Sequence, residues 1–106
     1  MIDERIKKLT HNLLNYSINL KKGEHILVEM MGEDSIPLGK EIIKQTEIMG
    51  AYPHFNMINY SVLREFLKNC SEEQIKMYAK HDLQRMQDMD AYVGISANPN
   101  TAEWNR

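Results

Sequence analysis

Several features that would narrow the class of this protein at once are rare or missing. A single cysteine, Cys70, excludes an internal disulfide, and the N-terminus lacks the basic, apolar and small-residue order of a signal peptide. No apolar run approaches the roughly 20 residues that span a bilayer. These absences predict a soluble protein of a reducing cytoplasm with no membrane partner.

An excess of charge of one sign is missing as well. The 106 residues include 13 basic and 15 acidic side chains, intermixed along the chain, for a formal net charge of −2. No basic face is available for a phosphate backbone, so nucleic acid is not expected as a partner. With 42% hydrophobic and 26% charged residues, the composition is that of one globular domain with a modest core.

Residues arranged for catalysis are also scarce. None of the four histidines lies four residues from another, as a pair of metal ligands on one helix face would. We interpret His11 and His81 as residues of helix surfaces. His25 and His54 are interpreted as residues of strand ends. Cys70 follows a predicted helix without a base beside it and is interpreted as a small, partly buried side chain, so no catalytic or metal-binding residue is predicted.

The stretch of residues 23–58 is typical of one βαβ unit and sets the predicted fold class. Residues 25–30 form a short, mostly apolar run, which favours a strand buried on both faces of a parallel sheet. Residues 51–58 are extended again and rich in aromatic side chains. Because Pro53 cannot donate a ladder hydrogen bond, this second strand is predicted at the sheet edge.

A helix is predicted between these two strands. Asp34 or Ser35 can cap its start, Pro37 suits its first turn, and Gly50 suits its end. One face of this helix is predicted to face the core, and it consists of Leu38, Ile42, Ile43, Thr46 and Met49.

Another helix is predicted before this unit, over residues 3–20, and Lys21, Lys22 and Gly23 suit its end. Its apolar stripe consists of Ile2, Ile6, Leu9, Leu13, Tyr16 and Leu20.

Two helices and a third strand are predicted after the unit. Ser61 can cap a short helix, and Ser71 with Gln74 forms a capping box for a longer one that runs towards Met89. The longer helix carries an apolar stripe of Ile75, Ala79, Leu83 and Met86. Residues 91–96 form a third buried parallel strand.

These elements predict a three-layer α/β domain of flavodoxin- or Rossmann-like shape. Right-handed crossovers give a short parallel sheet with strand order 2-1-3. Further helices and strands would be needed to cover such a sheet, so we expect residues 1–106 to be the N-terminal domain of a longer two-domain protein. The tail from Asn98 to Trp104 is expected to be poorly ordered, or packed against a neighbouring molecule, without its domain partner.

A polar cleft is predicted at the carboxyl ends of the strands, where open α/β sheets bind ligands. Glu33 and Asp34 follow the first strand, Asn59 follows the second and Asn98 follows the third. These side chains are candidates for a cleft rim, but they provide no set of nucleophile, acid and base that would amount to catalysis.

The chain as a whole resembles the N-terminal portion of the thermophilic metalloaminopeptidases, the group that contains aminopeptidases T and S. The resemblance rests on three segments in order: LNYSINLKKGEHILVEMMGED, GAYPHFNMIN and LREFLKNCSEEQIKMYAKHDLQRMQDMDAYVGISANPNTAEW. It implies a cytoplasmic, homodimeric exopeptidase that removes N-terminal amino acids from peptide substrates.

In that family two divalent metal ions, zinc, cobalt or manganese, are held by a C-terminal domain, which would lie beyond Arg106. The resemblance therefore implies no catalytic residue, metal ligand or cofactor within this sequence. It implies that these residues wall the active-site cleft and support the dimer.

The alternative is a free-standing flavodoxin-like binding or regulatory module. Glu33 and Asp34 are similar to the acidic pair of a phosphate-accepting receiver domain. Against this, Ser96, Ala97 and Asn98 stand where such a domain needs an aspartate. A phospho-adduct after incubation with acetyl phosphate and magnesium would favour the module.

Overall fold

The fold is described from a computed structural model that covers residues 3–96 and 102–106. The helices and strands follow one another as α1 (Glu4–Asn12), a π-helical turn η1 (Leu13–Ser17), β1 (His25–Met31), a 3-10 turn η2 (Glu33–Ser35), α2 (Ile36–Ile48), β2 (Tyr52–Ile58), α3 (Tyr60–Asn69), α4 (Glu72–Gln87), β3 (Ala91–Ile95) and β4 (Ala102–Asn105). Within the described ranges no helix is both long and apolar enough to cross a bilayer.

The strands form one sheet with the order β2-β1-β3-β4. β1 pairs in parallel with β2 on one side and with β3 on the other, so that Val28 lies opposite both Phe55 and Val93. The predicted α/β class and the 2-1-3 order of the parallel strands are confirmed. Pro53 is on an edge strand, as predicted, where the missing N–H group disrupts no ladder.

β4 was not predicted. It runs antiparallel to β3, with Trp104 opposite Val93, and makes the sheet mixed instead of purely parallel. The expectation that the tail is poorly ordered is wrong for residues 102–105, because β3 would otherwise leave its backbone groups unpaired along one edge. Asn98 lies outside the described residues.

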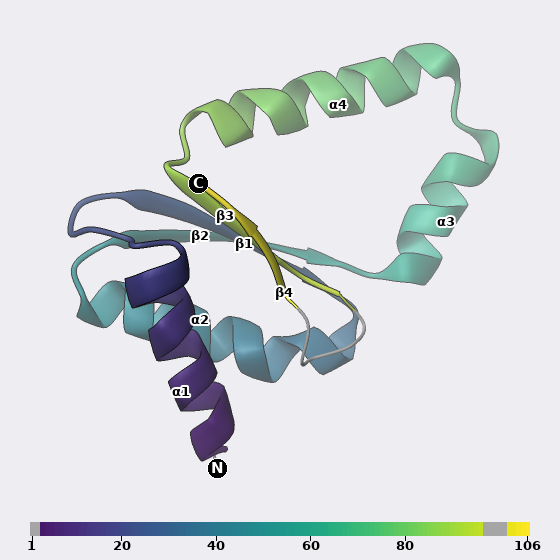
Figure 1. Cartoon of the computed structure of the whole chain (residues 1–106). Helices are drawn as coiled ribbons and strands as arrows, with labels where there is room; N and C mark the ends of the chain where they lie inside the picture. The colour runs from purple at the N-terminus through teal and green to yellow at the C-terminus, as the bar shows by residue number, and fades with distance from the viewer. Residues whose placement is uncertain (1–2, 97–101) are drawn as a thin grey trace.

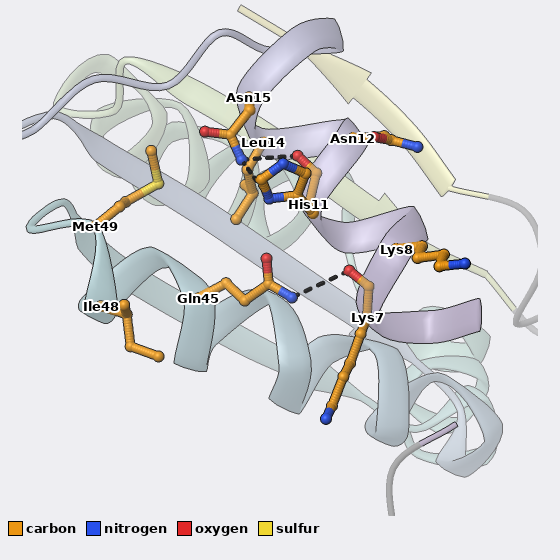
Figure 2. Close-up of a pocket in the computed structure, with 9 residues that line it drawn as sticks. All are labelled: Lys7, Lys8, His11, Asn12, Leu14, Asn15, Gln45, Ile48 and Met49. Carbon is orange, nitrogen blue, oxygen red and sulfur yellow. Dashed lines mark hydrogen bonds between the residues drawn. The ribbon is translucent and has the colours of Figure 1, made fainter. Parts of the chain in front are cut away.

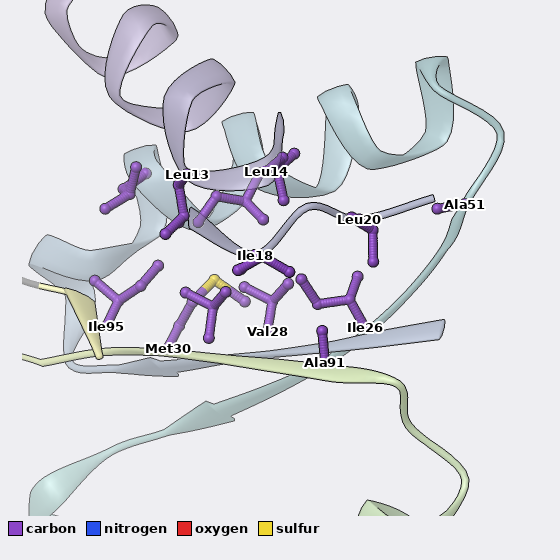
Figure 3. Packing of buried hydrophobic residues seen from close by; sticks show 13 residues of the cluster. Leu13, Leu14, Ile18, Leu20, Ile26, Val28, Met30, Ala51, Ala91 and Ile95 are labelled. Atoms are coloured by element: carbon purple, nitrogen blue, oxygen red, sulfur yellow. The ribbon is translucent and has the colours of Figure 1, made fainter. Parts of the chain in front are cut away.

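One face of the sheet carries the core. Ile26, Val28 and Met30 of β1 point to the side on which α1 and α2 lie (Figures 1 and 3). Each such side chain contributes roughly 1.5–3 kcal/mol when it is fully buried. The buried hydrophobic residues that join them are Leu13, Leu14, Ile18, Leu20, Leu38, Ile42, Ala51, Ala91, Val93 and Ile95.

The first helix ends at Ser17 rather than near Leu20, and its last turn is π-helical. A π turn contains an extra residue and therefore rotates the face that follows it. Tyr16, predicted on the core-facing stripe, is 75% exposed, whereas Leu14 and Ile18 are buried. Leu9, from the same predicted stripe, is 40% exposed.

α2 packs closely on β1. Pro37 is in its first turn and Gly50, with φ of 85°, ends it, both as predicted. A Cβ atom on Gly39 would lie 2.2 Å from the Met30 sulfur, so glycine permits this approach of helix to sheet.

α3 and α4 lie on the opposite side of the sheet from α1 and α2 (Figure 1). The capping box of Ser71 and Gln74 is present, but Asn59 caps α3 in place of the predicted Ser61. No residue in either helix is buried. The predicted core-facing stripe of α4 is largely in solvent, since Ile75 is 45% and Leu83 is 61% exposed.

Replacing Val28 by aspartate tests the burial of the central strand. Val28 has no exposed surface, so Val28→Asp should lower the free energy of unfolding by about 4 kcal/mol or more, as expected for an unpaired charge in a core. The same change at Val62, which is 67% exposed at the start of α3, is the control and should shift stability by less than about 0.5 kcal/mol. Urea unfolding of both variants gives the measurement. Equal stability of Val28→Asp and the wild type would contradict the burial.

Candidate functional site

The carboxyl ends of β1 and β2 meet as predicted, since the N–H of Gly32 donates to the carbonyl of Ile58 at 3.0 Å. Glu33 and Asp34 are exposed in the 3-10 turn that follows. The side chain of Asn59 is used to cap α3. That Glu33, Asp34 and Asn59 line the rim of a cleft stays a prediction.

The capping role of Asn59 limits what it can do for a ligand. Its Oδ1 accepts hydrogen bonds from the N–H of Ser61 at 2.9 Å, from the N–H of Val62 at 3.3 Å and from the Ser61 hydroxyl at 2.6 Å. This oxygen is therefore occupied, and only the amide NH₂ could face a ligand.

The face of the sheet turned away from the core is largely polar and only partly buried, which corrects the prediction that β1 is buried on both faces. Successive strand residues point to opposite faces, so the residues between the core positions share this second face. We call it the polar face, and it consists of His25, Leu27, Glu29, His54, Asn56, Tyr92 and Gly94. Only Leu27 among them is fully buried.

A carboxylate lies at the centre of the polar face. Glu29 is half-buried on the middle strand and accepts a hydrogen bond from the Tyr92 hydroxyl at 3.1 Å. Burial, followed by the negative charge of Glu29, raises the pKa of Tyr92 to about 12. At neutral pH the phenol therefore stays protonated and remains a donor to Glu29.

Arg85 connects α4 to the edge strand. Its guanidinium donates to the Asn56 side-chain oxygen and to the Phe55 carbonyl, the latter at 2.8 Å. Between β2 and α4 the surface is hollowed over about 350 Å³. We call this the β2–α4 hollow, and its lining consists of Asn56, Met57, Ile58, Tyr78, His81, Asp82 and Arg85.

Two histidines meet at the other end of the polar face. The Nδ1 atom of His25 and the Nε2 atom of His54 are 2.9 Å apart, and the ring of Tyr52 lies 5.0 Å from that of His25. A hydrogen bond at this distance needs one donor and one acceptor nitrogen, so both rings cannot be charged within it. Burial lowers the pKa of His54, and the positive charges of His25 and Arg85 add to this effect against the opposing charge of Asp88.

A second, larger hollow of about 640 Å³ lies between α1 and α2 (Figure 2). Gln45 of α2 donates to the Lys7 carbonyl at 3.2 Å and to the carboxylate of the buried Glu41 at 2.7 Å. Lys7 and Lys8 extend outward from α1 in Figure 2, so their charges do not converge on one point. This groove is therefore a weaker candidate than the polar face. Its lining consists of Lys7, Lys8, His11, Asn12, Leu14, Asn15, Gln45, Ile48 and Met49.

The four histidines and Cys70 lie on or next to the elements predicted for them. His11 and His81 are exposed on helices and Cys70 is partly buried after α3, all as predicted. His25 and His54 are on the predicted strands, but their contact was missed. The contact of Glu29 with Tyr92 and the contacts of Arg85 with β2 were not predicted either.

The residue pattern contained one signal for this site. In β1 and β3 residues of the polar face alternate with core residues, and period-two alternation indicates a sheet with two different faces. Reading residues 25–30 as a continuous apolar run overlooked Glu29.

Within residues 3–96 and 102–106, no group of three or more histidine, cysteine, aspartate or glutamate side chains is placed to hold a metal ion. Searches for related proteins gave no further indication: no protein-family model matches the chain, and no curated protein matches it.

The stability of the domain should depend on the protonation of His54. Because the pKa of His54 is lower in the folded than in the unfolded chain, the unfolded chain binds more protons below about pH 6.5. Stability should therefore be highest above that pH and fall as the pH drops towards the pKa of the folded state. In urea titrations between about pH 7.5 and 5.5, His54→Gln should show a smaller loss than the wild type. The same loss in both proteins would exclude this role of His54.

Proposed function

We propose that this chain is the non-catalytic N-terminal domain of a metal-dependent aminopeptidase that removes N-terminal amino acids from peptides. The sequence resemblance supports this proposal. In it, a second domain that follows Arg106 holds the two divalent metal ions, zinc, cobalt or manganese, and supplies the catalytic residues. The protein would work in the cytoplasm as a homodimer.

The structural observation that carries the proposal is a set of exposed apolar side chains on α3 and α4. We call these residues together the open helical face, and they are Val62, Phe66, Leu67, Ile75 and Leu83, which are between 36% and 67% exposed. Isolated helices of 10 and 16 residues are marginal in water unless they bury such a face. The open helical face is therefore suited to packing against another domain.

The size of this surface agrees with a domain contact. Five large side chains exposed by about half leave on the order of 500 Å² of apolar surface, close to the lower end of contacts between domains of one chain. Charged residues of α4 are interspersed with the apolar ones, with Glu72 and Glu73 at its start and Lys76 and Lys80 further along.

The role of the domain in this proposal is to bind and orient the substrate. The exposed carboxylates of Glu33 and Asp34, at the joined ends of β1 and β2, would form part of the cleft wall. Negative charge there attracts the positively charged amino terminus of a peptide. Proton transfer and attack on the peptide bond would belong to the second domain.

A free-standing flavodoxin-like binding module is the second candidate. The β2–α4 hollow favours it, because charged and apolar side chains line one small space there without a second domain. The two candidates differ in the reading frame after Arg106. A stop codon at that point would contradict the aminopeptidase proposal.

The proposal predicts that the 106-residue chain contributes to substrate binding but cannot hydrolyse a peptide by itself. The 106-residue chain alone, supplied with zinc, cobalt or manganese, should release no product from a leucyl chromogenic amide. The protein that continues beyond Arg106 should release it in a metal-dependent way. In that longer protein, Leu83→Glu places a charge in the open helical face and should lower activity and melting temperature, because the domain contact is weakened.

Met77→Glu is the matched control. Met77 is on the same helix and is 54% exposed, but it lies off the stripe that contains Ile75 and Leu83. It should leave activity and melting temperature close to the wild type, and both variants should leave the 106-residue chain folded. Equal effects of the two variants, or hydrolysis by the purified 106-residue chain, would refute the proposal.

A further inference from the structure

Two opposite charges line the β2–α4 hollow without pairing. Asp82 and Arg85 are three residues apart on α4, and both face the hollow. Within the described residues neither makes an ion pair within 4 Å. Arg85 donates two hydrogen bonds to β2, which leaves further N–H groups of its guanidinium available.

The rest of the hollow is lined by apolar side chains and by one histidine. Ile58 and Tyr78 offer apolar surface, and the exposed His81 of α4 lies beside them. Glu29 of β1 lies opposite Asn56 of β2 in the strand register. A second carboxylate is therefore next to the side-chain amide that Arg85 contacts. The hollow therefore combines one fixed positive charge, nearby negative charge and an apolar wall in about 350 Å³, at the lower end of the volumes of small-molecule sites.

We propose that the β2–α4 hollow binds a free α-amino acid with an apolar side chain. The carboxylate of the ligand would accept hydrogen bonds from Arg85, its ammonium group would donate to Asp82, and its side chain would lie against Ile58 and Tyr78. Charge-assisted hydrogen bonds of this kind fix orientation as well as affinity. The ligand is bound and not transformed.

Other ligand classes match the hollow less well. A phosphate group would be repelled by Asp82 and by Glu29 behind it. A diamine would satisfy the carboxylates but would place a positive charge beside Arg85. A purely apolar ligand would leave both charges desolvated and unpaired, which is costly. A zwitterion with an apolar portion pairs with both charges of the hollow and covers its apolar wall.

This proposal is independent of the aminopeptidase proposal, because it is tested by binding and not by hydrolysis. The 106-residue chain is titrated with L-leucine at concentrations on the order of millimolar and followed by calorimetry and by NMR shifts of Asp82, Arg85 and Ile58. Leucinamide, which lacks the carboxylate, and 4-methylpentanoate, which lacks the ammonium group, should each bind about tenfold more weakly or worse.

Two variants and two controls complete the test. Asp82→Asn and Arg85→Gln should each weaken leucine binding about tenfold or more. Asp88→Asn and Lys80→Gln likewise remove one negative and one positive charge, at exposed residues of α4 or its end that do not line the hollow, and they should bind as the wild type does. Arg85 also anchors α4, so the fold of Arg85→Gln is checked by circular dichroism. If Arg85→Gln is unfolded, Asp82→Asn alone decides the outcome. Absence of leucine binding, or unchanged binding by Asp82→Asn, would overturn the proposal.

Discussion

The rest of the structure depends on the burial of one face of β1. Ile26 and Val28 have no exposed surface, and Met30 has almost none. Their side chains meet α2, which approaches closely because Gly39 has no side chain to collide with Met30. Once this face is buried, the neighbouring strand β3 has a fixed register, since a slip of one residue would turn its core side chains, Ala91, Val93 and Ile95, outward.

The other face of the same strand is built differently, and this difference places the candidate sites. Glu29, Asn56 and Tyr92 are held by hydrogen bonds and charge rather than by close packing. α4 is anchored to the edge strand by Arg85 but buries none of its residues. Elements that bury little apolar surface open more easily than the core, and such elements commonly form binding surfaces and domain contacts. The β2–α4 hollow and the open helical face both belong to this part of the molecule.

Sequence patterns predicted most of the framework because the framework follows local rules. The three parallel strands, the 2-1-3 order and the edge position of Pro53 follow from apolar runs, crossover handedness and the missing N–H group. The cap on α4 follows from Ser71 and Gln74, which are close in sequence. Each of these features depends on residues within one or two elements.

The features that were missed depend on residues far apart in sequence or on small changes of helix geometry. Arg85 reaches Asn56 across 29 residues, and His25 reaches His54 across 29, so neither contact can be read from periodicity. The π turn in η1 shifts the buried face from Tyr16 to Leu14 and Ile18, and nothing in the local sequence marked it. Of the predicted rim, Asn59 was placed at the right strand end, but its role in capping α3 was not anticipated.

Amide hydrogen exchange of the 106-residue chain tests most directly whether the two faces of the sheet differ in this way. Amides of residues 26–30 and of Val93 should exchange only through global unfolding, because they lie in the fully buried centre of the sheet. Amides in the middle of α4, residues 75–83, should exchange at least roughly 100-fold faster, because the helix can open without disturbing the core. Equal protection of α4 and β1 would show that α4 is part of the same cooperative core, and would contradict a domain built on one buried face.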